Sequence, residues 1–414
     1  MKMTESTIKH SLWTSVSSAP HQYPWLAQDC SCQVAVVGGG LAGAFAAYTF
    51  AKAGLKTALV SRSPIGYGET AGGMGILEYD HDEGLLSLAK KIGKEKAVQA
   101  FSLCRQALDR IEEICGGLKE DVGFVRRDCL VCTEDKQEAD RFYDEYRMRR
   151  HNGFDVQMLT RETAGELFSF PLEAGILSKG LGGEVDPYRL CCALVRAAKE
   201  AGAQVYENTG ILSIAPARGK MLLQSDYGKS IRADKVVLAT GVEQDSYLNA
   251  LSARRTAFCV ATEPVSSFAG YQSRCIIRDN RAPYTRVRST GDGRILIGGL
   301  DSSLIGADGK IGGLLKAKKM VDVRYQELQH ALEEMFCAIP DLCAQYAFSC
   351  SQAATRDRLP VIGEHSDYPG FLFDLCCGGS GILYAALGAQ MLLKQIQGED
   401  CPELQLFSPH RYTL

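Results

Sequence analysis

The stretch that decides the fold is residues 34–43, which read Val-Ala-Val-Val-Gly-Gly-Gly-Leu-Ala-Gly. The apolar residues Val34–Val37 have the composition of a buried parallel strand. They run into the spacing Gly-x-Gly-x-x-Gly, and an Ala-rich helical pattern follows over Ala44–Ala53. A strand, a tight glycine turn and a helix in this order are typical of a dinucleotide-binding unit. A glycine-rich turn that binds no ligand is the alternative.

Each of the three glycines in this spacing has a role in binding a dinucleotide. Gly38 makes the tight turn, Gly40 lets the backbone approach a pyrophosphate, and Gly43 lets the helix pack on the strand. The helix N-terminus offers free N–H groups and the positive end of its dipole to the phosphates. We therefore predict that the cofactor contacts Gly38, Gly39, Gly40, Leu41, Ala42 and Gly43.

One expected residue is missing from this unit. The second strand, Leu55–Val60, should end in an acidic residue that holds the ribose hydroxyls, but Ser61 and Arg62 stand there. Serine can make a hydrogen bond but cannot clamp both hydroxyls. The arginine would suit the 2′-phosphate of NADP, so an NADP-dependent dehydrogenase is an alternative.

Length, charge and composition exclude several classes of protein. The chain has 414 residues, long enough for two domains, and its net charge of −3 without a basic block argues against nucleic acid as a partner. No apolar run reaches the roughly 18 residues of a transmembrane segment, and Met1–His21 has no apolar signal region. Sixteen scattered cysteines without zinc spacing predict free thiols, no metal site and a cytoplasmic protein.

Nucleotide-type signals recur at 38–43, 239–241 and 378–381, and β-rich and helical segments separate them. One domain is therefore discontinuous, and a second is inserted into it. Other predicted elements are a glycine-rich loop at 66–75, a helix over Tyr188–Ala201 with Asp186 as its N-cap, antiparallel strands within 255–300 with a hairpin at Gly291–Gly293, and helices over 314–337 and Ile382–Ile396.

The order of these motifs resembles the D-amino acid oxidase-like family of FAD-dependent oxidoreductases, which includes glycine oxidase, monomeric sarcosine oxidase and bacterial D-amino acid dehydrogenase. The resemblance spans nearly the whole chain, from residue 33 to residue 412. The matching motifs are Gly38–Gly43, Gly182–Pro187, Ala239–Gly241, Thr262–Pro264, Asp292–Arg294 with Gly298–Gly299, Thr355–Gly363, Gly378–Ile382 and Pro409–Tyr412.

The resemblance implies FAD as cofactor and an α/β fold, with a discontinuous Rossmann-like FAD-binding domain and an inserted α+β substrate domain that carries an antiparallel sheet. The implied FAD-binding segments are 30–85, 182–250 and 346–414, the substrate-binding segments are 86–181 and 251–345, and 1–29 is a lead-in. Further implied FAD contacts are Ser61 and Arg62 at the ribose, Thr70, Ala71, Gly72 and Gly73 along the diphosphate and flavin, Ile211, Thr240 and Gly241 at the adenosine half, and Gly379, Ser380, Gly381 and Ile382 at the pyrimidine edge of the flavin.

The resemblance also implies a reaction. A small amine or amino acid would lose a hydride from the carbon next to nitrogen to flavin N5, and the imine would hydrolyse. Oxygen or a quinone would accept the electrons. The alternatives are a 2-hydroxy-acid or polyol oxidoreductase on the same fold, and a flavin-binding subunit with little catalysis of its own.

Candidate substrate residues lie on one predicted strand. Alternation puts Tyr284, Arg286 and Arg288 on one face, and an arginine with a tyrosine suits a carboxylate. Tyr284 matches the family tyrosine that meets the substrate carboxylate. Salt bridges on a sheet surface are the alternative for the two arginines. The usual substrate arginine of the family falls at Gln352, which can hydrogen-bond but cannot neutralise charge.

Cys350 has two interpretations. It lies five residues before Thr355, the spacing at which sarcosine oxidase carries the cysteine that binds flavin covalently. The alternative is a small residue in place of glycine, in a chain that uses cysteine freely.

Overall fold

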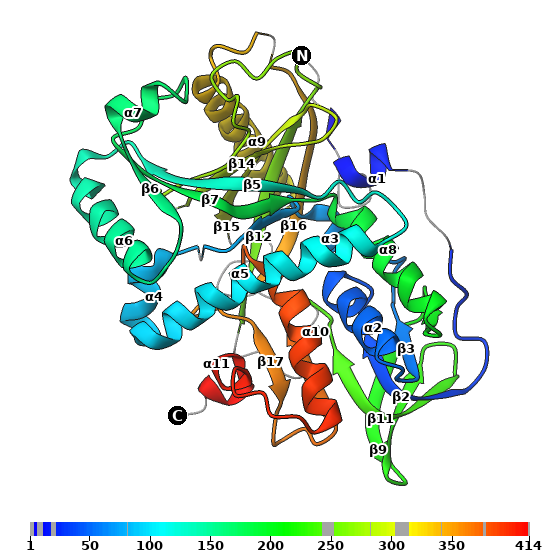
Figure 1. Cartoon of the computed structure of the whole chain (residues 1–414). Helices are drawn as coiled ribbons and strands as arrows, with labels where there is room; N and C mark the ends of the chain where they lie inside the picture. The colour runs from blue at the N-terminus through cyan, green and yellow to red at the C-terminus, as the bar shows by residue number, and fades with distance from the viewer. Residues whose placement is uncertain are drawn as a thin grey trace.

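The computed structural model describes residues 4–5, 11–17, 22–80, 82–241, 252–281, 283–302, 314–340, 342–375 and 378–412. Their strands form one sheet of eight strands and one of ten, and helices pack between and around the two sheets (Figure 1). The fold class predicted from the sequence is confirmed.

The smaller sheet is built around the glycine turn. Strand β2 (Cys30–Val37), helix α2 (Leu41–Lys52) and strand β3 (Thr57–Val60) follow one another, and the two strands pair in parallel. Gly38 has a φ of +125°, and a Cβ at this position would overlap the carbonyl oxygen of Ala239. Only glycine fits this turn, as the spacing predicted.

The other strands of the smaller sheet come from distant parts of the chain. Its order is β17–β18–β11–β2–β3–β8, and β10 pairs with β11 and β9. From β18 to β8 neighbouring strands are parallel, so the glycine-rich segments that follow β18, β11 and β2 meet at one edge. The bounds are β8 (Gln204–Tyr206), β9 (Ile211–Ala217), β10 (Lys220–Ser225), β11 (Ser230–Leu238), β17 (Val361–Glu364) and β18 (Phe371–Leu375).

The larger sheet has the order β1–β16–β12–β15–β14–β13–β5–β7–β4, with β6 paired to β7. Its pairs are antiparallel except β1 with β16 and β13 with β5. The predicted hairpin at Gly291–Gly293 joins β14 to β15, with Ser289 opposite Ile295. The bounds are β1 (Thr4–Glu5), β4 (Ile76–Glu78), β5 (Val125–Thr133), β6 (Val156–Thr160), β7 (Ala174–Glu184), β12 (Ser252–Thr262), β13 (Ile276–Asp279), β14 (Thr285–Ser289), β15 (Ile295–Ser302) and β16 (Ala344–Thr355).

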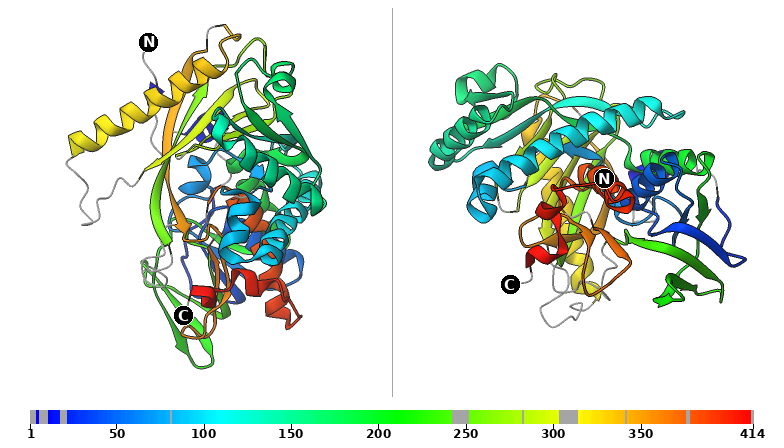
Figure 2. Two further views of the ribbon diagram at one scale, coloured as in Figure 1. Left: turned by 90° about the vertical axis from the view of Figure 1, so that its left-hand side faces the viewer. Right: turned by 60° about the horizontal axis from the view of Figure 1, so that its bottom comes forward.

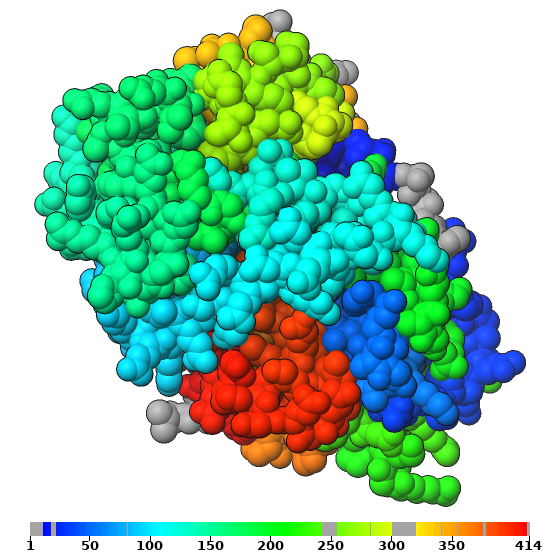
Figure 3. All heavy atoms as spheres, viewed as in Figure 1, coloured from blue at the N-terminus to red at the C-terminus, as the bar shows by residue number. Residues whose placement is uncertain are grey.

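The main core lies among four helices. Helix α2 packs against α8 (Pro187–Glu200) and α10 (Gly381–Gln397), and α10 packs against α5 (Lys94–Gly117). Figure 3 shows the same neighbourhood, where the C-terminal part of the chain (red) lies against α5 (cyan) and α2 (blue). As predicted, Asp186 caps α8, because its carboxylate accepts hydrogen bonds from the first amides of the helix.

The remaining helices cover other surfaces. Helix α9 (Leu314–Met335) packs on β12 and β15, on the side of the larger sheet away from α5 (Figure 2). No helix in the described residues is long and apolar enough to cross a membrane. The short helix α3 lies in the segment predicted as a glycine-rich loop. The other bounds are α1 (Leu12–Val16), α3 (Glu69–Gly72), α4 (Gly84–Ile92), α6 (Ala139–His151), α7 (Arg161–Gly165), α11 (Leu404–Phe407), η2 (Lys136–Glu138) and η3 (Pro409–Tyr412).

The predicted domain boundaries stay a prediction. Strand β4 and most of β16 fall in segments assigned to the FAD-binding domain, 30–85 and 346–414, yet both strands pair in the larger sheet. Parts of the lead-in 1–29 and residues 242–250 lie outside the described residues. The fourteen cysteines within the described residues are free, as predicted.

A Gly38→Ala variant tests the turn. We expect it to lower the free energy of unfolding by about 2–4 kcal/mol, because the methyl group combines an unfavourable φ with an overlap. Gly54→Ala is the matched control, since Gly54 also has a positive φ but its Cβ would meet nothing within 4 Å. Urea unfolding should show a loss of about 1 kcal/mol for the control. Equal losses would contradict the steric argument.

Candidate active site

One large cavity runs along the edge where the parallel strands end and reaches the larger sheet. Its volume is 430 Å³. The residues predicted to contact FAD that line it are Gly38, Gly39, Gly40, Leu41, Ala42, Ser61, Arg62, Thr70, Gly72, Gly73, Ile211, Thr240, Gly241, Gly379, Gly381 and Ile382. The predicted substrate residues that line the same cavity are Tyr284, Arg286 and Gln352. The predicted residues outside its lining are Gly43, Ala71, Cys350, Ser380 and Arg288.

The start of α2 forms one wall of the cavity. Its N-cap residue is Gly40, which has no side chain that could accept hydrogen bonds from the first amides of the helix. The amide of Leu41 donates to the hydroxyl of Thr70 on α3 at 3.0 Å. A helix start that is capped by glycine leaves further amides for an anionic ligand. This wall therefore fits the pyrophosphate of a dinucleotide.

The end of β3 lacks the acidic residue that usually holds ribose. The hydroxyl of Ser61 donates to the carbonyl of Ser63 at 2.6 Å, so it is engaged within its own loop. The nearby Glu207 accepts hydrogen bonds from the amides of Tyr23 (2.9 Å) and Ile65 (2.6 Å), so it holds loops in place. The end of the cavity where ribose is predicted to bind thus differs from the usual dinucleotide site.

Glu69 lines the cavity and was missed by the sequence analysis. It begins α3, and a Cβ on Gly241 would lie 3.3 Å from its carboxylate. Burial raises the pKa of the Glu69 carboxyl to about 8, so the group is largely neutral at pH 7. A neutral carboxyl can donate a hydrogen bond to a phosphate oxygen, whereas an ionised one would repel it. The sequence contained one indication of this residue, because Glu69 directly precedes Thr70, a predicted FAD contact.

The start of α10 forms the opposite end of the cavity. The side chain of its N-cap residue, Ser380, makes no hydrogen bond to the helix, and its hydroxyl instead donates to the carbonyl of Glu78 at 3.0 Å. The amide of Gly379 donates to Asp82 at 3.4 Å. The guanidinium of Arg286 lies directly against Gly379, where a Cβ would overlap it. This end therefore combines a helix N-terminus with a fixed cation.

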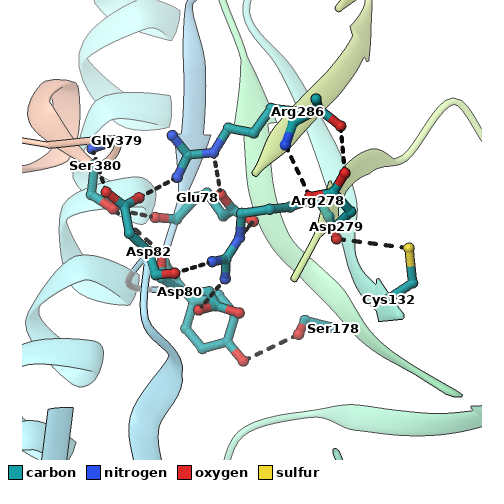
Figure 4. Close-up of polar contacts among 12 residues, drawn as sticks. Glu78, Asp80, Asp82, Cys132, Ser178, Arg278, Asp279, Arg286, Gly379 and Ser380 are labelled. Carbon is teal, nitrogen blue, oxygen red and sulfur yellow. Dashed lines mark hydrogen bonds and ion pairs between the residues drawn. The ribbon is translucent and has the colours of Figure 1, made fainter. Parts of the chain in front are cut away.

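The same end rests on a buried network of charges (Figure 4). Arg286 pairs with Asp82 at 2.5 Å and with Glu78 at 3.2 Å. Asp80 pairs with Arg278 at 2.8 Å and with Arg149 at 2.6 Å. Burial raises the pKa of Glu78, while Arg278 and Arg286 act against that shift. The sequence offered one signal, the alternation of acidic residues at 78, 80 and 82.

Arg288 does not lie in the cavity. Its buried guanidinium donates to the carbonyls of Met74, Gly75 and Val185 at 2.7–2.8 Å. Burial lowers the pKa of Arg288. The geometry therefore argues against the predicted role of Arg288 in binding a substrate, because its donors hold the glycine-rich loop and the segment before α8.

Cys350 and Gln352 lie on β16 and differ in their surroundings. The Cys350 side chain is buried against Gly72, where a Cβ would overlap it, and it does not line the cavity. Gln352 does line it. Covalent attachment of flavin at Cys350 stays a prediction, with Gly72 between this side chain and the cavity.

Comparison with known proteins identifies the family. Residues 33–395 match the family model described as FAD dependent oxidoreductase, DAO. The chain belongs to this family. The predicted cofactor, FAD, and the predicted oxidoreductase class are thereby confirmed, and the NADP alternative is not supported.

Individual relatives cover most of the chain at low identity. Glycine oxidase of Geobacillus kaustophilus is 26% identical over 89% of this chain and 93% of its own length. The probable oxidoreductase OrdL of Haemophilus influenzae is 21% identical over 92% of this chain and 86% of its own length. The solved structure of the Geobacillus glycine oxidase has a TM-score of 0.76 at 22% identity, covering 92% of this chain and 99% of that one. L-amino acid deaminase from Proteus myxofaciens has a TM-score of 0.78 at 15% identity, covering 95% and 96%.

The raised pKa of Glu69 predicts a pH dependence of FAD binding. The carboxyl is neutral below about pH 8, so it favours the anionic cofactor at low pH, and this contribution is lost as the pH rises through that value. We expect the dissociation constant of FAD for the apoprotein to rise about tenfold between pH 6.5 and 9.5. Glu69→Gln should flatten this profile. Parallel profiles for both proteins would contradict the role of Glu69.

Proposed function

We propose that the protein oxidises a carbon–nitrogen bond of a small amine or amino acid. The observation that carries the proposal is that Tyr284 and Gln352 line the same cavity as the glycine turns expected to hold FAD. Relatives named glycine oxidase, which cover about nine-tenths of the chain, support this choice of substrate class.

FAD, when bound, supplies the acceptor for a hydride from the carbon next to nitrogen. The glycine turns after β2 and β18 would hold the cofactor at its pyrophosphate and flavin ends. The N-terminus of α10 would favour negative charge at the flavin end. The walls of the cavity would keep water from the reacting carbon. The imine product would then hydrolyse.

The substrate would lie between the larger sheet and the flavin end of the cavity. Tyr284 would orient it, and its ring centroid lies 5.0 Å from the Arg286 guanidinium. Arg286 already has two carboxylate partners. Its charge is therefore balanced by protein groups, and it offers little net attraction to a substrate carboxylate.

Anaerobic titration tests the reaction class. We expect a small amine or amino acid to bleach the visible flavin band of the purified holoprotein and to release an imine-derived product, such as ammonia or an aldehyde. A 2-hydroxy acid of the same carbon skeleton is the matched control and should leave the band unchanged. Bleaching by the hydroxy acid alone would favour the hydroxy-acid alternative. No reduction by either would favour a flavin-binding subunit with little catalysis.

A Tyr284→Phe variant tests the orienting role. Loss of a hydrogen bond to a carboxylate should raise KM for an amino acid about tenfold, while kcat changes less. KM for an amine without a carboxylate should stay near its original value. Tyr143→Phe, on the exposed face of α6, is the control. An unchanged KM for the amino acid in Tyr284→Phe would exclude Tyr284 from carboxylate binding.

A further inference from the structure

A second cavity adjoins the first. Its volume is 310 Å³, and Tyr284 lines both cavities. Its walls carry Asp82, Arg149 and Arg278 from the buried charge network, together with Arg141, Arg255, Arg281 and Arg358. The second cavity therefore lies beside the place where the substrate would lie, and Tyr284 belongs to both walls.

The charges on its walls are mostly balanced. Each wall carboxylate has a cationic partner: Asp82 pairs with Arg286, Glu83 with Lys91, Glu138 with Arg141, Glu145 with Arg149 and Asp279 with Arg281. Arg278 is neutralised by Asp80. Arg255 also lines this cavity, and no carboxylate among the described residues pairs with it. The cavity therefore has one cation available to a ligand.

Arg255 stands directly across from Gln352. The two residues are opposed in the antiparallel pair of β12 and β16, so their side chains leave the sheet on the same face. Ala257, two residues along β12, lines the first cavity together with Gln352. The family's substrate arginine falls at Gln352, and here a guanidinium stands on the neighbouring strand instead.

A strained residue lies on the wall of the second cavity. Arg358 has a φ of +61°, which costs an arginine free energy that the surroundings must supply. Its guanidinium is 3.9 Å from Asp82, a carboxylate already paired to Arg286 at 2.5 Å. Backbone strain of this kind concentrates at ligand sites. Arg358 thus adds a second, loosely paired guanidinium near Tyr284.

We propose that the second cavity binds a carboxylate of the substrate and that Arg255 is the residue that binds it. The substrate would be an amine whose acidic group is separated from the oxidised carbon, because the cation stands one strand beyond Gln352 and on the far side of Tyr284. The inference rests on the proposed amine oxidation in the first cavity. Arg358 would assist from the same wall.

Ligand binding to the holoprotein tests this site without turnover. Glutaramate and the diamide glutaramide have nearly the same shape, and they differ in one carboxylate, which only glutaramate carries. Each is titrated while the flavin absorption spectrum is recorded. We expect wild type to bind glutaramate about tenfold or more tightly than glutaramide, and Arg255→Gln to lose this preference. Arg255→Lys should keep part of it.

Arg281→Gln is the matched control. Arg281 lines the same cavity and is solvent-exposed, but Asp279 pairs with it at 2.6 Å. The preference should survive in this variant. No preference in wild type, an unchanged preference in Arg255→Gln, or an equal loss in Arg281→Gln would overturn the proposal.

This inference rests on the proposed amine oxidation, but the two experiments distinguish the failure of one from the failure of the other. If amines do not reduce the flavin while the glutaramate preference still depends on Arg255, the amine oxidation falls and the anion site stands. If amines reduce the flavin while Arg255→Gln keeps the preference, the amine oxidation stands and the anion site falls.

Discussion

The buried ion pairs around strand β4 are the constraint on which the rest of the structure depends. Glu78, Asp80 and Asp82 face arginines from β13, β14 and α6. Removing one partner from such a cluster leaves an uncompensated buried charge, which costs about 3–5 kcal/mol. The network also contacts the start of α10 through Ser380 and Gly379. It therefore fixes the larger sheet against the start of α10.

The two sheets contribute different parts of the cavity wall. The smaller sheet brings its glycine turns together at one edge because its central strands are parallel. The larger sheet places Tyr284, Arg286 and Gln352 against that edge. If the substrate binds as proposed, substitutions on the larger sheet would alter its binding without disturbing the glycine turns.

Local features were predictable from the sequence, and partners of side chains were not. The glycine turn, the Asp186 cap and the 291–293 hairpin depend on neighbouring residues, so their patterns sufficed. Alternation predicted a shared face for Arg286 and Arg288. It could not show that Arg286 pairs with Glu78 and Asp82. Nor could it show that Arg288 donates to three backbone carbonyls and lies 3.7 Å from Glu184. The apposition of Arg255 and Gln352 depends on strand register across almost one hundred residues, which no local pattern contains.

The strand order of the smaller sheet also determines how the chain can fold as it is synthesised. Strand β2 lies between β3, which follows it at once, and β11, which is made much later. One edge of β2 therefore stays unpaired while the middle of the chain emerges from the ribosome. Glu78 likewise lacks its partners Arg278 and Arg286 until β13 and β14 have been made. Such late, non-local closure slows folding and leaves an open strand edge that can aggregate in the nascent chain.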